Sequence, residues 1–308
     1  MGLLGIWLAW RHIPLLRQAV GPLDWRGFAL TGFGLGLTIF GFASIGRQLL
    51  DARVAIGCLL LGLALLALYG LHARRHQRPL LDISLFRLST FRNGVLGGAL
   101  FRIGIGATPF LLPLMLQLSF GLSALESGLI TFTSAAGAMF MKALAARILR
   151  RHGFRRVLVT NAVVASALLC GFGLFRADTP YLVIVAVLLV SGCFRSLQFT
   201  SLNAIVYAEV DPARMAQASS VAAMVQQVAL ALGVTIGGYA LTLSSVATGA
   251  PADAAINFGF AFLTVGLLSA TSIVMMLRLA PDAGAEMSGR ARPGEELAEP
   301  RPASRPGT

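Results

Sequence analysis

Two arginines, Arg102 and Arg195, have the clearest chemical potential in the sequence, because each lies inside a long apolar run. On a helix rising ~1.5 Å per residue, Arg102 is ~14 Å beyond Asn93, and Arg195 is ~21 Å beyond Tyr181. An arginine near the centre of a bilayer costs roughly 2.5–3.5 kcal/mol, so it normally faces a partner or a water-filled cavity. Both are therefore predicted to face a cavity within a membrane.

Amide side chains extend the polar surface around the two arginines. Gln198 follows Arg195 at helical spacing, and Asn203 lies about 80° further round the same helix. Gln117 returns to within ~60° of the direction of Arg102. Hydrogen bonds that cement helix packing are the alternative interpretation of such residues. The predicted wall of a substrate pathway comprises Arg102, Gln117, Arg195, Gln198, Asn203 and Gln227.

Acidic residues that could neutralise these arginines are missing from the apolar runs. Glu126 lies near the start of one run and Glu209 near the end of another. The positive charges therefore need an anion from a substrate, from a part of the protein outside this sequence, or from a second chain. The runs also contain no embedded carboxylate that could carry protons.

Signatures of enzymes, metal sites and cofactor sites do not occur in the sequence. We find no GxSxG, HExxH, phosphate-binding glycine loop or paired-cysteine spacing. The histidines lie among arginines between the apolar runs and are predicted to be solvated; they are His12, His72, His76 and His152. The prediction is a protein that is no enzyme and that has neither a metal nor a cofactor.

Membrane-spanning helices must position these residues. Of 308 residues, 56% are hydrophobic and 12% charged, against roughly 45–50% and about 25% in soluble domains. A span needs about 20 mostly apolar residues. Such runs occur at Phe28–Ile45, Val54–Leu71, Gly94–Leu116, Ser123–Ala145, Val157–Phe175, Tyr181–Ile205, Ala218–Leu243 and Phe258–Leu277. The predicted fold is all-α: a polytopic integral membrane protein with about eight transmembrane helices.

Glycine spacing predicts one close helix contact. Gly233 and Gly237 stand four residues apart in the seventh run, with Gly238 next to them. Small residues at this spacing let two helix backbones approach in a bilayer. The seventh helix is therefore expected to pack closely on a neighbour.

The basic residues predict how the chain is oriented. The net charge of +12 would suggest nucleic acid in a soluble protein, but the arginines fall between the apolar runs. If the sides alternate from a cytoplasmic 11–26, the inner segments hold nineteen arginines and the outer segments three. This asymmetry follows the positive-inside rule. It predicts a multi-pass inner-membrane protein with a cytoplasmic C-terminus and no nucleic-acid partner.

The two ends of the chain differ from the middle. Met1–Trp10 is apolar but too short to span, and we expect it to be the end of a truncated helix. Residues 280–308 are rich in Pro, Gly, Ala and charge. Such a composition predicts a disordered cytoplasmic tail.

Several stretches together resemble one family, the 14-helix drug/proton antiporters (EmrB/QacA type) of the major facilitator superfamily. Asp24–Gly27 is similar to the entry to the family's middle helices, and Pro79–Phe86 to the link into its C-terminal six-helix domain. Pro109–Gln117, followed by Gly121 and Gly128, resembles its ninth and tenth helices, and Gln227–Gly238 resembles its thirteenth. The matching stretches follow in the family's order.

An arginine-rich segment resembles the second copy of the superfamily's loop motif, in which an Asp, basic residues and a Gly lock neighbouring helices. Arg151, Gly153 and Arg155 match the motif, but Arg150 stands at its acidic position. The resemblance implies a conformational role for these residues. A basic cytoplasmic turn explains the same residues without such a role.

The resemblance implies a division of the chain into five parts. Residues 1–26 would be the end of a truncated helix and a cytoplasmic loop, and 27–72 a two-helix hairpin. Residues 73–92 would be a basic cytoplasmic linker, 93–279 the C-terminal six-helix transporter domain, and 280–308 the tail. The eight spans would then be helices 7 to 14 of the family.

The implied activity is that of a proton-coupled efflux antiporter working by alternating access. Its partners would be a small amphipathic substrate, protons and the lipid bilayer, together with an N-terminal half that this sequence lacks. The alternative is a truncated or half-transporter subunit that is inactive without a separate N-terminal half. The two unpaired arginines fit either case.

Overall fold

The computed structural model describes residues 24–47, 50–75, 81–251 and 253–288, and every regular element in these ranges is a helix. Eight segments are long and apolar enough to cross a membrane. They are α2 (Trp25–Arg47), α3 (Ala52–Arg75), α4 (Ser89–Leu114, continued by a π turn at Met115–Ser119), α5 (Ala124–His152), α6 (Phe154–Gly171), α7 (Tyr181–Ile205), α8 (Met215–Thr248) and the final span formed by α9 (Ala255–Ala270) and α10 (Ser272–Leu277). The predicted all-α fold and its eight spans are confirmed, whereas the helix end expected at residues 1–10 lies outside the described residues.

The surface of the bundle is apolar where a soluble protein would be polar. Leu182 on α7 is 79% exposed, and Leu125 on α5 is 73% exposed. Apolar surface left in water costs roughly 25 cal/mol per Å². Lipid removes this cost, so the surface agrees with a multi-pass membrane protein.

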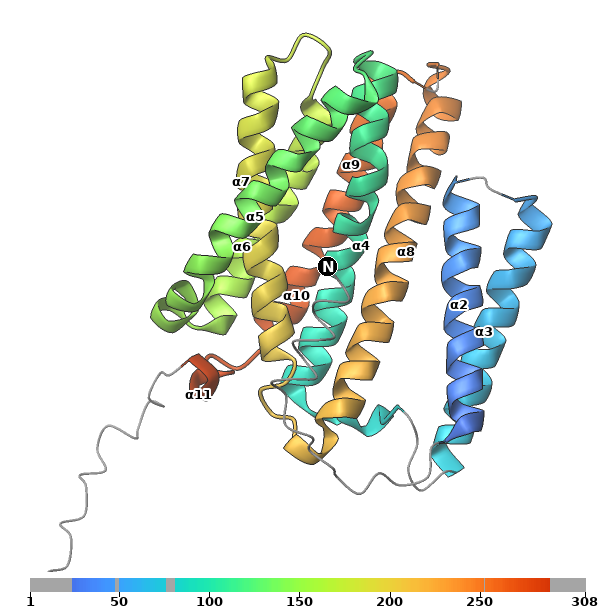
Figure 1. The fold of residues 1–308 in the computed structure, drawn as a ribbon, viewed down its shortest axis with the longest axis vertical. Helices are drawn as coiled ribbons and strands as arrows, with labels where there is room; N and C mark the ends of the chain where they lie inside the picture. Colours follow the sequence, from blue (N-terminus) through green and yellow to red (C-terminus); the bar gives the residue numbers. More distant parts are fainter. Residues whose placement is uncertain (1–23, 48–49, 76–80, 252, 289–308) are drawn as a thin grey trace, which may run out of the picture.

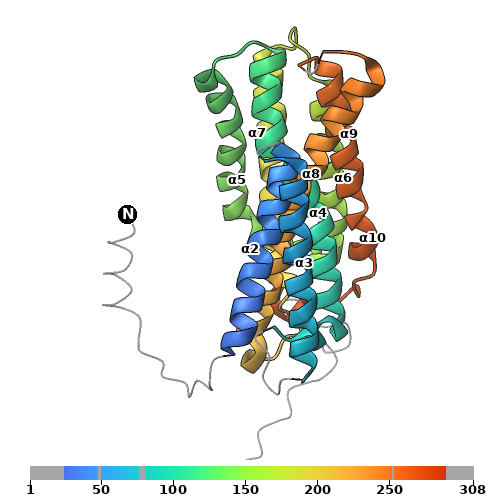
Figure 2. The ribbon, with the colours of Figure 1, turned by 90° about the vertical axis from the view of Figure 1, so that its right-hand side faces the viewer.

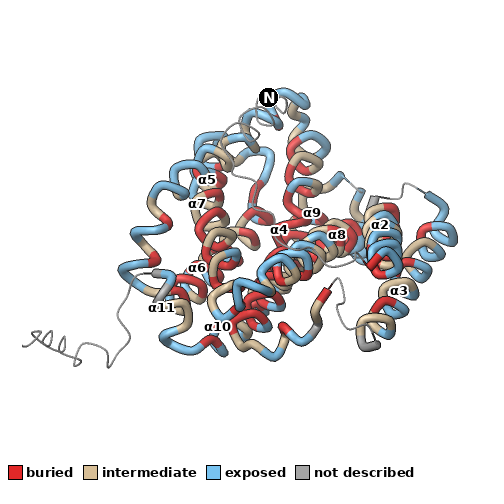
Figure 3. Tube along the Cα trace, turned by 60° about the horizontal axis from the view of Figure 1, so that its bottom comes forward, coloured by how far each residue is buried: buried red, intermediate tan, exposed pale blue. Residues whose placement is uncertain are grey.

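The eight spans form one bundle with a hairpin at its edge (Figure 1). Helix α4 packs against α8 and α9, α5 packs against α7, and α6 packs against both α7 and α9. The hairpin of α2 and α3 contacts the bundle mainly through α2 and α8, as the turned view shows (Figure 2). Helix α4 is the most buried span, and its buried positions lie at the middle of the bundle (Figure 3).

Helices α5 and α7 approach so closely that only glycine fits between them. A Cβ atom added at Gly137 would lie 2.1 Å from the carbonyl oxygen of Leu189. Gly192 on α7 meets the carbonyl oxygen of Ser134 in the same way, at 2.0 Å. The Cys193 thiol also reaches the Gly137 carbonyl at 3.2 Å. This crossing fixes the position of α5, which has few other contacts with the bundle.

The glycine seam predicted on the seventh span packs against α4. A Cβ atom at Gly233 would lie 2.1 Å from the carbonyl oxygen of Ile103, and one at Gly237 would lie 3.0 Å from the Cβ of Ala107. The close approach expected from the spacing of these glycines is therefore confirmed. It holds α8 against the central helix, where the candidate site lies.

The arginine-rich connections gather at one end of the bundle. The start of α2, the α3–α4 connection, the α5–α6 and α7–α8 turns and the end of α10 all lie at the lower end in Figure 1. The connections with few arginines lie at the upper end. The eight spans therefore place the basic connections at the same end of the bundle. The assumption that successive connections alternate between the two sides of the membrane requires this arrangement.

The α5–α6 connection differs from the expected cytoplasmic loop at 147–156. Helix α5 continues to His152 and α6 begins at Phe154, so Gly153 alone separates them. Gly153 has φ 76° and ψ 161°, a conformation open essentially only to glycine. The arginines before it belong to the last turns of α5, where their long side chains can reach beyond the apolar layer.

The base of the hairpin holds a histidine that was expected to be solvated. His72 lies on α3, and its Nε2 is 3.0 Å from both carboxylate oxygens of Asp24. Asp24 also accepts a hydrogen bond of 2.8 Å from the backbone N–H of Gly27 at the start of α2. The expectation of a solvated loop side chain is therefore wrong for His72. His12 and His76 lie outside the described residues.

An ion pair joins the segment before α4 to the start of α8. Arg214 donates hydrogen bonds of 2.6 Å to the Asp82 carboxylate and to the Ser84 hydroxyl. Asp82 also accepts from the Ser84 N–H at 2.9 Å, which caps the short helix Ile83–Arg87. Burial raises the pKa of Asp82, but its hydrogen bonds with Ser84 and Arg214 outweigh burial and lower the pKa below its ordinary 3.8.

The substitution Asp82→Asn is expected to lower stability at neutral pH by up to about 1 kcal/mol, because the pair is partly exposed. A carboxyl whose pKa is lowered by folding stabilises the protein above its unfolded pKa. This contribution disappears as the pH falls through the lower, folded pKa. Thermal unfolding in detergent at pH 7, 5 and 3 should therefore show the wild type and the variant converging at acidic pH.

The matched control is Asp211→Asn. Asp211 caps the short helix Pro212–Arg214 by accepting from the Ala213 N–H at 2.8 Å, and asparagine caps equally well. Its unfolding midpoint should stay close to that of the wild type at each pH. A deficit of Asp82→Asn that persists unchanged to pH 3 would contradict the role of the ionised carboxylate.

The first residues of the predicted disordered tail are placed against the bundle. Ala283 packs against the hydrophobic core that contains Phe154, and α11 (Ala285–Ser288) follows. Residues 289–308 lie outside the described residues. Residues 280–288 therefore have a defined structure, in contrast to the predicted disorder.

Candidate functional site

Arg102 lies in the middle of α4 and is only 5% exposed. Its Nη2 donates a hydrogen bond of 2.8 Å to the Oδ1 of Asn203. The guanidinium carbon lies 5.0 Å from the ring centre of Phe199, within the range of a cation–π contact. Its Nε has no hydrogen-bond partner in the described part of the chain. Among the described residues, the ion pairs involve other side chains, so Arg102 is buried without a counter-ion there.

A cavity of about 280 Å³ opens beside this arginine. Helix α4, the end of α7 and the first turns of α8 enclose it, so it lies toward the arginine-rich end of the bundle. Asn203 and Ser219 are exposed, which opens the cavity to the outside of the described bundle. The side chains that line it are Val95, Arg102, Asn203, Val206, Tyr207, Ser219, Ala222, Ala223 and Gln226.

Arg195 shares a helix face with Phe199 and Asn203 but makes different contacts. It is half-buried, and its Nη2 lies 3.4 Å from the Ser134 hydroxyl of α5. It stands eight residues before Asn203, or ~12 Å along the helix. The structure therefore brings both predicted arginines to α7, where Arg102 bonds with Asn203 beside the cavity and Arg195 faces Ser134 of α5.

The structure does not bring Gln198 to this face. Gln198 is fully buried and points toward α6 and α10. Its Oε1 accepts a hydrogen bond of 2.8 Å from Asn161, and its Nε2 lies 3.1 Å from the sulfur of Met276. These contacts fit the alternative interpretation of the sequence, in which polar side chains in the spans form hydrogen bonds between packed helices.

The two remaining glutamines of the predicted wall lie away from the Arg102 cavity. Gln117 is exposed in the π turn that ends α4, near the opposite end of the bundle. Gln227 is exposed on α8, while its neighbour Gln226 lines the cavity. Adjacent residues of a helix differ by about 100° in direction. The structure thus brings Arg102, Asn203 and Gln226 together.

The predicted loop motif lies at the α5–α6 turn and contacts the last span. Arg155 donates a hydrogen bond of 2.9 Å to the carbonyl oxygen of Leu277, the last residue of α10. A cation at a helix C-terminus is favourable because the carbonyl groups there are unpaired and carry partial negative charge. Arg151 is exposed at the end of α5. Gly153 makes the turn, and Arg155 ties it to α10.

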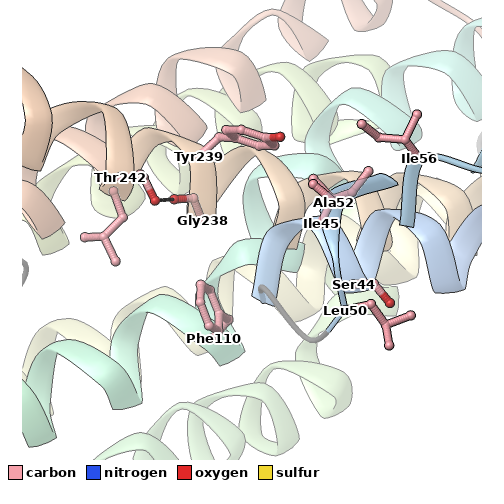
Figure 4. Close-up of a pocket in the computed structure, with 10 residues that line it drawn as sticks. Ser44, Ile45, Leu50, Ala52, Ile56, Phe110, Gly238, Tyr239 and Thr242 are labelled. Carbon is pink, nitrogen blue, oxygen red and sulfur yellow. Dashed lines mark hydrogen bonds between the residues drawn. The ribbon is translucent and has the colours of Figure 1, made fainter. Parts of the chain in front are cut away.

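A larger cavity of about 490 Å³ lies between the hairpin and α8 (Figure 4). Ser44 of α2, Ile56 of α3, Phe110 of α4 and Tyr239 of α8 contribute to its walls. Within the described ranges, the buried Ser44 hydroxyl oxygen has no hydrogen-bond partner, and no charged side chain lines the cavity. Such a space offers apolar contact with little chemical selectivity, so the Arg102 cavity is the stronger candidate site.

Sequence reasoning missed two residues close to Arg102: Phe199 contacts its guanidinium, and Tyr207 lines the cavity. Phe199 stands four residues before Asn203, a spacing that places both on one helical face. Tyr207 follows the end of α7 and turns back to the cavity. The spacing of Phe199 was a usable signal, whereas the position of Tyr207 depends on a turn that the apolar pattern does not specify.

The fold and site define a class: a polytopic helical membrane protein with a buried, unpaired arginine beside a polar cavity. Among the described residues, no three His, Cys, Asp or Glu side chains come together as a metal site. The family model described as "Major Facilitator Superfamily" matches residues 94–305. The chain therefore belongs to the major facilitator superfamily.

The chain is similar over most of its length to bacterial relatives. It is 30% identical over 280 residues to HsrA of Haemophilus influenzae, whose name describes a transport protein, covering 91% of this chain and 60% of the relative. It is 30% identical over 288 residues to MdtD of Pectobacterium atrosepticum, whose name describes a multidrug resistance protein, covering 92% and 61%. MdtD of Escherichia coli is 32% identical over 244 residues, covering 79% and 52%. The chain thus spans about 60% or less of the length of these relatives.

Proposed function

We propose that this chain forms the C-terminal wall of the substrate pathway in a proton-coupled antiporter that exports small amphipathic compounds. Membership of the superfamily supports a transport role, and the multidrug-resistance name of MdtD supports export. The observation that carries the assignment is Arg102, buried without a counter-ion beside an open cavity. A buried charge in a membrane protein typically marks a substrate or ion pathway.

The complete transporter in this proposal is of the 14-helix type, with α2 to α10 as helices 7 to 14. This chain covers 60% of HsrA and 61% of MdtD from Pectobacterium atrosepticum, and we propose that the uncovered part corresponds to an N-terminal half of the transporter. The eight described spans contain a single acidic residue, Glu126, which lies in the first turn of α5. The proton-carrying carboxylate would therefore come from the N-terminal half. The basic end of the bundle would face the cytoplasm of a cell with this protein in its inner membrane.

Alternating access would use the six spans formed by α4 to α10 as one moving unit. The glycine contacts of α5 with α7 and of α4 with α8 hold its helices together. The hydrogen bond from Arg155 to Leu277 joins the α5–α6 turn to the last span. Rocking of such a unit against the other half would open the Arg102 cavity to one side of the membrane at a time.

The charge of the cavity bears on the substrate. Asn203 neutralises no charge, so Arg102 repels a cation and attracts an anionic group. We propose that the preferred compounds are anionic or zwitterionic amphipaths whose acidic group lies at Arg102. Val95 and Val206, which line the cavity, would contact the apolar part of such a compound.

Transport by the full-length protein in inside-out vesicles tests the proposed function. With fluorescein, an anionic aromatic probe, we expect uptake driven by an inward-acid pH gradient and its loss when nigericin collapses that gradient. Vesicles without the protein are the control. Gradient-dependent uptake that equals this control for fluorescein, and also for the cationic probe ethidium, would contradict a proton-coupled exporter. Uptake of ethidium alone would contradict only the proposed charge preference.

A further inference from the structure

A groove of about 550 Å³ lies between α5 and α6 on the floor formed by α7. Both helices pack on α7 and contact each other little, although they join at the Gly153 turn. Its volume falls within the roughly 300–1,000 Å³ of small-molecule pockets. Six apolar side chains form most of its walls: Met141, Ile148, Val157, Val164, Phe194 and Leu197.

The groove has the depth of one lipid leaflet. Met141 precedes His152 by eleven residues on α5, which is ~16 Å at the rise of an α-helix. Half of a ~30 Å hydrocarbon core is ~15 Å. An acyl chain entering from the basic end of the bundle would therefore reach about the midplane.

The mouth of the groove is basic. His152 and Arg156 line it and are exposed. The side chain of Arg155 donates to Leu277, but that of Arg156 has no hydrogen bond or ion pair within the described part of the chain. Residues 147–156 contain five arginines and no acidic residue. Basic pockets between spans at this level of a membrane attract anionic headgroups.

The polar groups inside the walls direct their hydrogens to the protein. The Thr160 hydroxyl donates to the Arg156 carbonyl at 2.9 Å. The Asn161 amide donates to the Phe194 carbonyl at 2.7 Å and to Gln198 at 2.8 Å. The Oδ1 of Asn161 is buried without a hydrogen-bond partner among the described residues, and the charged side chains of the groove are confined to its mouth.

We propose that this groove binds an anionic phospholipid of the adjacent leaflet, with the phosphate at Arg156 and one acyl chain along the apolar walls. The site is separate from the Arg102 cavity and does not depend on the proposed transport function. Because the groove begins at the α5–α6 turn, a bound lipid would brace the same helices that Gly153 and Arg155 connect.

Native mass spectrometry of the purified protein in detergent tests this site with two lipids of identical acyl chains, dioleoyl phosphatidylglycerol and dioleoyl phosphatidylcholine. We expect the anionic lipid to bind about tenfold more tightly, because each basic side chain near a membrane surface attracts an anionic lipid and one or two such side chains account for this ratio. Arg156→Gln should lower phosphatidylglycerol affinity about fivefold and leave phosphatidylcholine affinity within about twofold. Val164→Trp should weaken both lipids, since it fills the groove.

Arg92→Gln is the matched control, because Arg92 is an exposed arginine in the first turn of α4 at the same end of the bundle. Equal losses for Arg92→Gln and Arg156→Gln would overturn the site in favour of diffuse surface charge. Displacement of phosphatidylglycerol by inorganic phosphate would overturn it in favour of a soluble anion. If Val164→Trp is not monodisperse, Thr160→Trp at the exposed rim replaces it, and unchanged binding of both lipids would overturn the acyl-chain assignment.

Discussion

Replacing Arg102 by glutamine in the full-length protein is expected to lower transport of an anionic amphipath about ten- to a hundredfold. A hydrogen bond that involves a charged group contributes roughly 1.5–3 kcal/mol, and each 1.4 kcal/mol corresponds to about tenfold. Glutamine is uncharged and ends two bonds short of the arginine Nη2 that bonds with Asn203, so it cannot attract an anion into the cavity. Initial rates of fluorescein uptake in inside-out vesicles, normalised to the amount of protein, measure the loss.

The result must separate the charge of Arg102 from its contribution to packing. Arg102→Lys keeps the charge and should retain more transport than Arg102→Gln, although it loses the planar contact with Phe199. Arg92→Gln removes an exposed charge at the basic end and should transport normally. Relative to fluorescein, uptake of ethidium by Arg102→Gln should rise. Wild-type rates of fluorescein uptake by Arg102→Gln would remove Arg102 from the substrate pathway.

The apolar pattern predicted the eight spans because each span must satisfy its backbone hydrogen bonds within its own helix. A run such as Tyr181–Ile205 therefore shows its full extent in the sequence, and α7 has the same bounds. The glycine seam of α8 was predictable from spacing, since small residues four apart on one helix let a second helix backbone approach closely. Both inferences depend on one helix at a time.

The rotation of each helix could not be predicted in the same way. Arg195 and Gln198 differ by about 60° on a helical projection, so a small rotation of α7 places them on different sides. Gln226 and Gln227 pose the same problem on α8, and only the packing of α4 decides which one meets Arg102. The sequence thus identifies the polar residues of the spans, but contacts between helices decide which of them share a cavity.

The α5–α6 turn shows a second limit. The arginines of 147–156 indicate the side of the membrane, but they are also good helix formers, so α5 continues through them. Only Gly153 marks the break, and its positive φ is a property of the backbone. A motif that matches by residue type therefore did not reveal that Arg155 binds the end of α10.

The substitution Gly137→Ala is expected to destabilise the domain by about 1–3 kcal/mol, as overpacking does in other cores. The added methyl group would stand 2.1 Å from the Leu189 carbonyl oxygen, which belongs to a helix backbone and cannot rotate away. Helices α5 and α7 would have to separate. That separation would weaken the contact from Cys193 to the Gly137 carbonyl, now 3.2 Å.

Gly128→Ala is the control on the same helix, because a methyl group there would meet no atom within 4 Å. It should keep or slightly raise stability, since alanine favours helix over glycine by up to roughly 1 kcal/mol in water. The unfolding midpoints of both variants in detergent, followed by size-exclusion chromatography after heating, measure the difference. Equal midpoints for the two variants would show that α5 adjusts its distance from α7 at little cost. The hydrogen bond of 2.9 Å from the Ser196 hydroxyl of α7 to the Ala138 carbonyl of α5 would then contribute more to that junction than the glycine contact.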